Sequence, residues 1–295
     1  MFEVSKKYIN CRCGLHLKEY QKEDPDNPTR AGIIDSKGKF TSCHNHEHIT
    51  REKYEEVIPQ IIDEFLDAGF AETEKFFEKE IDITKEYNHL RKDNIDPNTI
   101  TAQKTSKSNT IIRKYMPHIY EVEDYRGNNM LKLWTKEKLV KAFKSLDKPN
   151  RTVNSNFSEI KRAIKFNPVT LYSPIMTKSI VKELNCKTVF DPCIGWGGRM
   201  VGTTCLGEDY HYTGCEPFTK TFKGLEEIVK DLGNEKQVTL YNSAVETILE
   251  ELNDQRFDMC LTSPPYFDLE VYSHEDTQSI KNYKTYEEWL NGFIK

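Results

Sequence analysis

The stretch that decides the fold reads Lys187-Thr188-Val189-Phe190-Asp191-Pro192-Cys193-Ile194-Gly195-Trp196-Gly197-Gly198-Arg199. Its first four residues include the β-branched and aromatic side chains typical of a short buried strand. The glycines that follow allow the backbone to approach a bound ligand closely and to open a helix. We therefore predict a strand over 187–190, a ligand-binding loop and a helix over 199–206.

Short strands and helices continue to alternate after this stretch. The sequence predicts strands over 211–215, 237–241 and 257–261, separated by helices over 219–232 and 244–252. Such alternation with short connections indicates βαβ units, a parallel sheet and right-handed crossovers. Sheets of this kind bind ligands at the carboxyl ends of their strands.

Each of these carboxyl ends holds a residue suited to one kind of ligand. Asp191 supplies a carboxylate, which suits an ammonium group better than a phosphate. Glu216 ends the second strand, where an acid can accept hydrogen bonds from both hydroxyls of a ribose. Asn242 and Ser243 follow the third strand and can read an adenine edge. An amino acid joined to a nucleoside fits this set, so we predict S-adenosyl-L-methionine as the cofactor.

The fourth strand end carries Ser263-Pro264-Pro265-Tyr266. Two consecutive prolines fix two φ angles and remove two N–H donors, so this loop is stiff and presents hydrogen-bond acceptors. An aromatic ring follows the prolines directly. Taken alone, the stretch is equally consistent with a plain Pro-Pro turn. Together with the other strand ends, it predicts a loop that holds a planar amine.

Residues 167–290 resemble the amino-methyltransferases of DNA, including phage-encoded members. The stretch from Asp191 to Gly197 is similar to their Asp-Pro-Phe-x-Gly-x-Gly cofactor loop, with Cys193 in place of the phenylalanine. Ser263-Pro264-Pro265-Tyr266 is similar to their (Ser/Asp/Asn)-Pro-Pro-(Tyr/Phe/Trp) catalytic loop. Residues 167–176 are similar to the segment that touches the methionine part of the cofactor.

This resemblance implies an α/β, Rossmann-like methyltransferase domain over 166–295. It also implies transfer of a methyl group from S-adenosylmethionine to the exocyclic amine of cytosine (N4) or adenine (N6), in a base flipped out of double-stranded DNA. Serine before the prolines favours cytosine. The implied catalytic residues are Ser263, Pro264, Pro265 and Tyr266. The implied cofactor-binding residues are Phe190, Asp191, Pro192, Cys193, Gly195, Gly197, Glu216, Pro217, Asn242 and Ser243.

Only 29 residues follow Tyr266, whereas the sheets of this family continue with further strands after the catalytic loop. We therefore expect an incomplete parallel sheet and a chain truncated at its C-terminus. Two other interpretations stay open. One is an RNA or protein methyltransferase of similar architecture, and the other is a truncated, non-catalytic chain that binds nucleic acid.

Residues 1–50 are predicted to be loop-rich, and they carry cysteines and histidines. Cys11, Cys13, Cys43 and His46 are candidate ligands for a structural zinc ion, which would stabilise a segment that has little core of its own. Against this interpretation, Cys-x-Cys is tighter than the usual Cys-x-x-Cys spacing. The alternative is that these cysteines and histidines are separate polar residues that bind no metal.

Residues 51–165 are predicted to be mainly helical, with Thr50 capping a first helix that stops at Gly69 and a second helix over 72–91. The part from 100 to 165 has fifteen basic and six acidic residues, whereas the chain as a whole has a net charge of −5. A basic block between acidic ones is typical of a surface that binds a polyanion. A solvated lysine-rich surface is the alternative. A weak helix-turn-helix pattern would place Lys161, Arg162 and Lys165 on DNA.

The sequence has no apolar run long enough to span a bilayer and no apolar signal core near Met1. We therefore expect a cytoplasmic protein without a membrane partner. Its eight cysteines are then reduced, as core residues or metal ligands.

Overall fold

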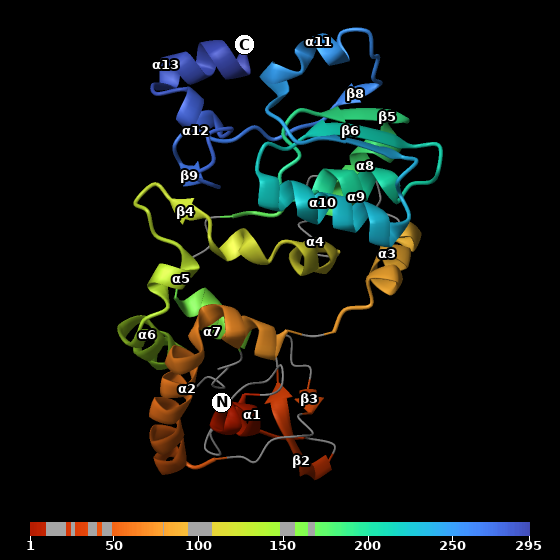
Figure 1. Cartoon of the computed structure of the whole chain (residues 1–295). Coiled ribbons are helices and arrows are strands. Elements are labelled where there is room, and N and C mark those ends of the chain that lie inside the picture. Colours follow the sequence, from red (N-terminus) through yellow and green to blue (C-terminus); the bar gives the residue numbers. More distant parts are fainter. Residues whose placement is uncertain are drawn as a thin grey trace. The chain divides into compact units, whose positions relative to one another are not determined.

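The computed structural model describes residues 1–9, 49–78, 80–93, 108–147, 157–164 and 169–295, together with the backbone of 22–24, 27–34 and 40–42 (Figure 1). The chain forms two compact units. The helical unit comprises Met1–Lys79 and Asn128–Asn167, and the α/β unit comprises Glu80–Gly127 and Pro168–Lys295. The division thus differs from the predicted domain boundary at 166, because residues 80–127 pack with the sheet-containing part of the chain.

The helical unit is built around one buried phenylalanine. Its helices are α1 (Glu3–Tyr8), α2 (Arg51–Phe77), α5 (Met130–Leu133), α6 (Lys136–Leu146) and α7 (Phe157–Ala163). Phe65 of α2 is fully buried, and its ring lies 5.8 Å from that of Trp134 and 6.0 Å from that of Phe157. The indole N–H of Trp134 donates to the carbonyl of Phe65 at 3.0 Å. Segments far apart in the sequence are thereby fastened to α2.

The predicted start of the first helix and the predicted end of the second agree with the structure, whereas the predicted boundary between the two helices does not. Thr50 caps α2 as predicted, because its side chain accepts the N–H of Lys53. Gly69 has φ 74° and interrupts the helical backbone as predicted, but the helix resumes after it and ends at Phe77. The predicted helix over 72–91 is therefore divided into the end of α2 and α3 (Ile83–Lys92), which Asp82 caps.

Residues 1–50 contain more strand than the sequence predicted. β1 (Lys22–Asp24), β2 (Asn27–Ile34) and β3 (Phe40–Ser42) form an antiparallel sheet in the order β1-β2-β3. The strands are short and β2 contains a proline and a glycine, two residues that weaken a strand pattern. Local periodicity therefore gave little sign of this sheet.

The α/β unit contains the predicted parallel sheet. β5 (Thr188–Asp191), β6 (His211–Cys215), β7 (Val238–Tyr241) and β8 (Met259–Cys260) are all parallel and lie in the order β7-β6-β5-β8. After β5 the chain builds outward through β6 and β7, then returns to place β8 on the other side of β5. The carboxyl end of β5 is therefore a topological switch point, where Rossmann-like folds bind their ligands.

Helices α8 (Pro174–Glu183), α9 (Gly198–Thr204) and α10 (Thr219–Leu232) lie on one face of this sheet (Figure 1). α10 has the predicted bounds, whereas the predicted helix over 244–252 is a 3-10 turn (Val245–Thr247) followed by α11 (Leu249–Leu252). The unit ends in α12 (Ser279–Asn282), α13 (Tyr286–Trp289) and a π-helical turn (Leu290–Ile294). Within the described residues, no helix is both long and apolar enough to cross a membrane.

Residues 80–127 belong to the α/β unit through α3, α4 (Asn109–Tyr115), the 3-10 helix Pro117–Tyr120 and β4 (Glu123–Asp124). The buried Lys178 of α8 donates to the carbonyls of Leu90 at 2.7 Å, Arg91 at 2.9 Å and Asp93. A cation at the last carbonyls of α3 satisfies groups that have no partner within the helix. β4 pairs antiparallel with β9 (Glu270–Val271), which follows the predicted catalytic loop.

Helix α9 packs so closely on α8 that only glycine fits at position 202. A Cβ atom there would lie 2.3 Å from the carbonyl oxygen of Pro174 and 2.6 Å from Cβ of Thr177. We expect Gly202→Ala to lower the free energy of unfolding by about 2 kcal/mol and Gly202→Val to lower it further, because overpacking forces the two helices apart. Urea denaturation measures both, with exposed Lys230→Ala in α10 as the control. Equal or higher stability of Gly202→Ala would contradict this packing.

Candidate cofactor and substrate site

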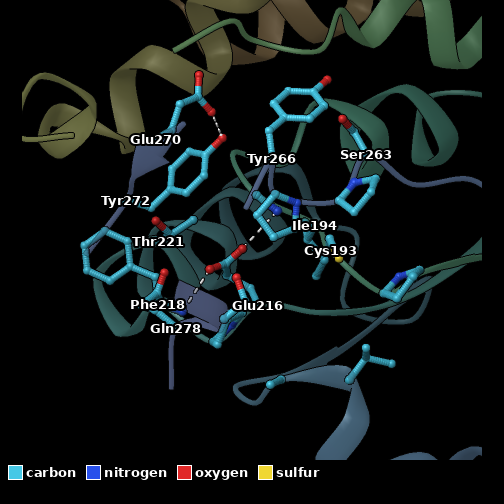
Figure 2. Close-up of a pocket in the computed structure, with 18 of the residues that line it drawn as sticks. Cys193, Ile194, Glu216, Phe218, Thr221, Ser263, Tyr266, Glu270, Tyr272 and Gln278 are labelled. Atoms are coloured by element: carbon cyan, nitrogen blue, oxygen red, sulfur yellow. Dashed lines mark hydrogen bonds between the residues drawn. The ribbon is translucent and has the colours of Figure 1, made fainter. Parts of the chain in front are cut away.

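A cavity of about 450 Å³ opens at the carboxyl ends of the strands of the α/β unit (Figure 2). This volume is in the range typical of sites for small molecules. The predicted cofactor loop, the end of β6 and the predicted catalytic loop all contribute to its wall. The predicted site residues that line it are Pro192, Cys193, Gly195, Glu216, Pro217, Ser263, Pro264, Pro265 and Tyr266.

Phe190, Asp191, Gly197, Asn242 and Ser243 do not line the cavity. Phe190 stacks on Phe257 with ring centroids 5.1 Å apart. Gly197 has φ 86°, and a Cβ atom there would lie 2.7 Å from the side chain of Leu225. The amide of Asn242 donates to the carbonyl of Glu216 at 2.9 Å, which holds the end of β6. The structure thus places these predicted residues around the site and not in its wall.

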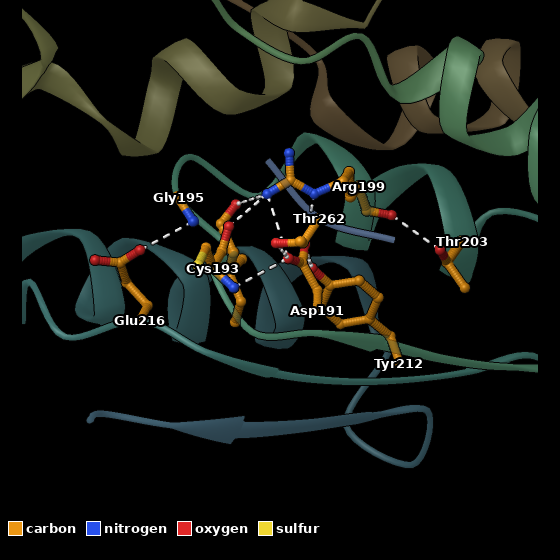
Figure 3. Close-up of polar contacts among 9 residues, drawn as sticks. Asp191, Cys193, Gly195, Arg199, Thr203, Tyr212, Glu216 and Thr262 are labelled. Atoms are coloured by element: carbon orange, nitrogen blue, oxygen red, sulfur yellow. Dashed lines mark hydrogen bonds and ion pairs between the residues drawn. The ribbon is translucent and has the colours of Figure 1, made fainter. Parts of the chain in front are cut away.

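Asp191 has a different role from the predicted contact with an ammonium group. Its side chain is fully buried, and four protein groups donate to its two carboxylate oxygens (Figure 3). Oδ2 accepts from Nε of Arg199 at 2.6 Å and from the hydroxyl of Tyr212 at 2.5 Å. Oδ1 accepts from Oγ1 of Thr262 at 2.7 Å and from the backbone N–H of Cys193 at 3.2 Å. A carboxylate with four donors is already neutralised within the protein.

The donors to Asp191 come from different elements around the cavity. Tyr212 belongs to β6, Arg199 begins α9, and Thr262 directly precedes Ser263. Arg199 itself is buried, and its Nη2 also donates to the carbonyls of Cys193 at 2.5 Å and Ile194 at 3.2 Å. This ion pair therefore fixes both the cofactor loop and the start of the catalytic loop.

Glu216 is the predicted ribose-binding acid, and it reaches the cavity wall from the end of β6. Its Oε2 accepts the N–H of Gly195 at 2.9 Å, and its Oε1 accepts the N–H of Phe218 at 2.8 Å. Burial raises the pKa of this carboxyl to about 8, although the two backbone donors favour the ionised form. Once ionised, Glu216 can still accept hydrogen bonds from a ligand, because each oxygen has a second lone pair.

The opposite part of the cavity wall is aromatic. Tyr266 is 58% exposed, so a planar group can stack on its ring. Tyr272 also lines the cavity, and its hydroxyl donates to Oε2 of Glu270 (Figure 2). The sequence analysis missed Glu270 and Tyr272. Their alternation in Glu270-Val271-Tyr272 was the available signal, but a two-residue strand paired with a distant β4 is too short to detect from sequence.

Two further predictions concern the N-terminal half of the chain. The zinc candidates Cys11, Cys13, Cys43 and His46 lie outside the described residues. Among the residues that are described, no group of three or more His, Cys, Asp or Glu side chains is arranged to hold a metal ion.

The basic side chains predicted to face DNA are partly engaged within the helical unit. Lys161 pairs with Glu74 at 2.6 Å and is only about one-fifth exposed, because α7 packs against α2 there. Arg162 is exposed but pairs with Glu159 at 2.7 Å. Lys165 lies outside the described residues. Contact of these side chains with DNA stays a prediction.

No protein-family model matches the chain, and no curated protein matches it. One solved structure that it resembles is a Staphylococcus aureus protein provisionally assigned as a caffeoyl-CoA O-methyltransferase. The match has 20% sequence identity and a TM-score of 0.28, and it covers 36% of this chain and 53% of that one. The chain thus spans about half the length of that protein. The Rossmann-like assignment rests on the parallel sheet and its strand order, and the DNA amino-methyltransferase family remains a prediction.

The role of Asp191 is testable through stability. We expect Asp191→Ala to lower the free energy of unfolding by about 3–5 kcal/mol, because it leaves the Arg199 guanidinium buried without its counter-ion. Urea denaturation without any ligand measures this loss. The double variant Asp191→Leu with Arg199→Met removes both charges and should recover much of the loss. If Asp191→Ala were as stable as the wild type, the carboxylate would not be the anchor described above.

The raised pKa of Glu216 predicts a pH dependence of stability. Between pH 4.5, the usual value, and about pH 8, the folded protein holds a proton that the unfolded chain has lost. The free energy of unfolding should therefore fall as the pH rises through this window, by at most about 1.4 kcal/mol per pH unit. Denaturant titrations across the window measure the slope. Glu216→Gln has no titrating group here and should show a shallower fall; an identical slope would contradict the shift.

Proposed function

We propose that this protein is an S-adenosylmethionine-dependent methyltransferase that acts on the exocyclic amine of cytosine (N4) or adenine (N6) in DNA. The observation that carries the proposal is that one cavity is lined by the glycine-containing loop after β5, by Glu216 after β6 and by Ser263-Pro264-Pro265-Tyr266 after β8. Methyl transfer requires the cofactor loop and the amine-holding loop to face the same space.

The charges of the cavity wall fit this cofactor. The Asp, Glu, Lys, Arg and His residues that line the cavity are Arg199, Glu216, Glu246 and Glu270. Asp191 neutralises the guanidinium, so the wall presents no uncompensated positive charge to a bound ligand. S-adenosylmethionine carries a net positive charge, which such a wall does not repel. The buried hydroxyl of Ser243 has no hydrogen-bond partner among the described residues. Ser243 follows β7, where we predicted contact with the adenine edge.

The catalytic loop suits a weakly nucleophilic amine. Pro264 and Pro265 have no backbone N–H to donate, so their carbonyls are acceptors without competing donors from the same residues. We propose that Oγ of Ser263 and the carbonyl of Pro264 accept the two amine hydrogens. The nitrogen lone pair then leaves the ring plane and points to the methyl group that the bound cofactor supplies. Tyr266 stacks on the flipped base, and holding both reactants in line lowers the barrier by several kcal/mol.

Contact with the phosphate backbone is proposed for the helical unit, because residues 166–295 have a net negative charge. Helix α6 exposes Lys136, Lys141 and Lys144. The first two form exposed ion pairs with Asp63 and Glu137. Such pairs contribute little in water, and a phosphate can replace the carboxylate partner.

Two measurements test the proposal together. Calorimetric titration should detect S-adenosylmethionine binding, and mass spectrometry of nucleosides from DNA treated with protein and cofactor should detect N4-methylcytosine or N6-methyladenine. Tyr266→Ala should keep cofactor affinity but reduce DNA methylation at least about tenfold, because stacking on a base contributes about 1–3 kcal/mol.

Exposed Leu249→Ala in α11 lies outside the cavity wall and serves as the control. Absence of cofactor binding would refute the methyltransferase assignment. Binding accompanied by methylation of RNA or protein, but not of DNA, would refute only the proposed substrate.

A further inference from the structure

Glu270 and Tyr272 form a polar pair in the substrate side of the cavity that the proposed chemistry does not use. Both residues come just after the catalytic loop, on or directly beside β9. β9 is held in place by β4, with Asp124 opposite Glu270 and Glu123 opposite Val271. The segment 80–127, which no methyltransferase motif marks, therefore positions this pair in the cavity wall (Figure 2).

The carboxyl of Glu270 has one oxygen committed and one available. Oε2 accepts the hydroxyl of Tyr272. Oε1 accepts no hydrogen bond from the described residues, and it is not fully buried. Burial raises the pKa of Glu270, while the hydrogen bond from Tyr272 opposes that shift. Glu270 thus holds a proton more readily than an exposed glutamate does.

Cytosine and adenine share one feature next to the amine that would be methylated. In both bases the adjacent ring nitrogen is a hydrogen-bond acceptor, whereas the matching ring nitrogen of guanine and thymine carries a hydrogen. A protonated carboxyl can donate to the acceptor, and it leaves the amine hydrogens to the Ser-Pro-Pro loop. Because the ring nitrogen is a weak base, the proton stays on the carboxyl and the amine keeps its lone pair.

We propose that Glu270, in its protonated form and oriented by Tyr272, donates a hydrogen bond to the ring nitrogen beside the reacting amine and so selects cytosine or adenine. This inference rests on the proposed function. Glu270 is then a specificity-determining residue that touches the substrate, and Tyr272 is a positioning residue that acts through it. No covalent step or additional reactant is involved.

The proposal predicts a loss of methyl transfer as the pH rises through the pKa of Glu270, which burial raises above its usual value, because ionised Glu270 has no proton to donate. Other titratable groups near Glu270 are Tyr272 itself, Tyr266 in the preceding loop, and Glu123 and Asp124 on the facing β4. Glu216 titrates in the same cavity, but its ionisation should strengthen cofactor binding. Saturating cofactor therefore separates the two effects.

The test compares Glu270→Gln, Glu270→Leu and Tyr272→Phe with the wild type. Methylation of mixed-sequence DNA is measured at saturating S-adenosylmethionine from about pH 5 to about pH 9, and cofactor affinity by calorimetry. The amide of glutamine donates at every pH, so Glu270→Gln should methylate within a few-fold of the wild type and lack the loss with rising pH. Glu270→Leu should lose about tenfold or more with cofactor affinity unchanged, because the donor is gone. Tyr272→Phe should move the loss to higher pH, because the hydrogen bond from Tyr272 lowers the pKa of Glu270.

Asp276→Asn, an exposed acid just beyond Tyr272 and outside the cavity wall, is the matched control. Wild-type rates for Glu270→Leu, or an unchanged loss with rising pH in Glu270→Gln, would overturn the inference while leaving the proposed function intact. Cofactor binding by each variant confirms that it is folded. A wild-type protein that binds no S-adenosylmethionine would overturn both proposals, and calorimetry detects that case separately.

Discussion

The buried ion pair between Asp191 and Arg199 is the interaction on which the α/β unit depends. A carboxylate without solvent is stable only if charge and hydrogen bonds compensate it. Here the compensation comes from the next strand, from the helix after the glycine loop and, through Thr262, from the loop after β8. Three connections that are separate in sequence are therefore forced to meet at one point. The cavity is lined by the glycine-containing loop after β5 and by the loop after β8, the two loops that Asp191 holds.

This arrangement explains why the sequence pointed to this region without revealing the hydrogen bonds that Asp191 makes within the protein. Asp191 ends β5, and the strand order places this end at the switch point of the sheet. Sequence spacing, however, did not reveal that Arg199, eight residues further on, points back at the same carboxylate. The position of Arg199 in the first turn of α9 allows that contact, but the contact requires the loop conformation, which the residue types alone do not determine.

Elements with a clear local pattern were predicted well from the sequence, whereas contacts between distant segments were not. β6 and α10 have the predicted bounds, because each combines a clear hydrophobic period with turn residues at its ends. The position of residues 80–127 depends instead on Lys178 closing the end of α3 and on β4 pairing with β9. Neither contact leaves a periodic signal, since one is a single buried ammonium and the other is two residues long. Glu270 and Tyr272 were missed for the same reason.

Two carboxyls in the same cavity have pKa values shifted in the same direction, and the two proposals give them opposite tasks. Burial favours the protonated form of both Glu216 and Glu270. Glu216 receives two backbone N–H groups, which stabilise its carboxylate, and a ribose diol would add two further donors when it binds. Glu270 receives one phenol, and the ring nitrogen of a base would add an acceptor, which stabilises the protonated acid. Ligand binding would therefore move the two groups apart, leaving Glu216 ionised and Glu270 neutral. Different surroundings can thus give two similar carboxyls different charge states. One cavity can then accept hydrogen bonds at one end and donate them at the other.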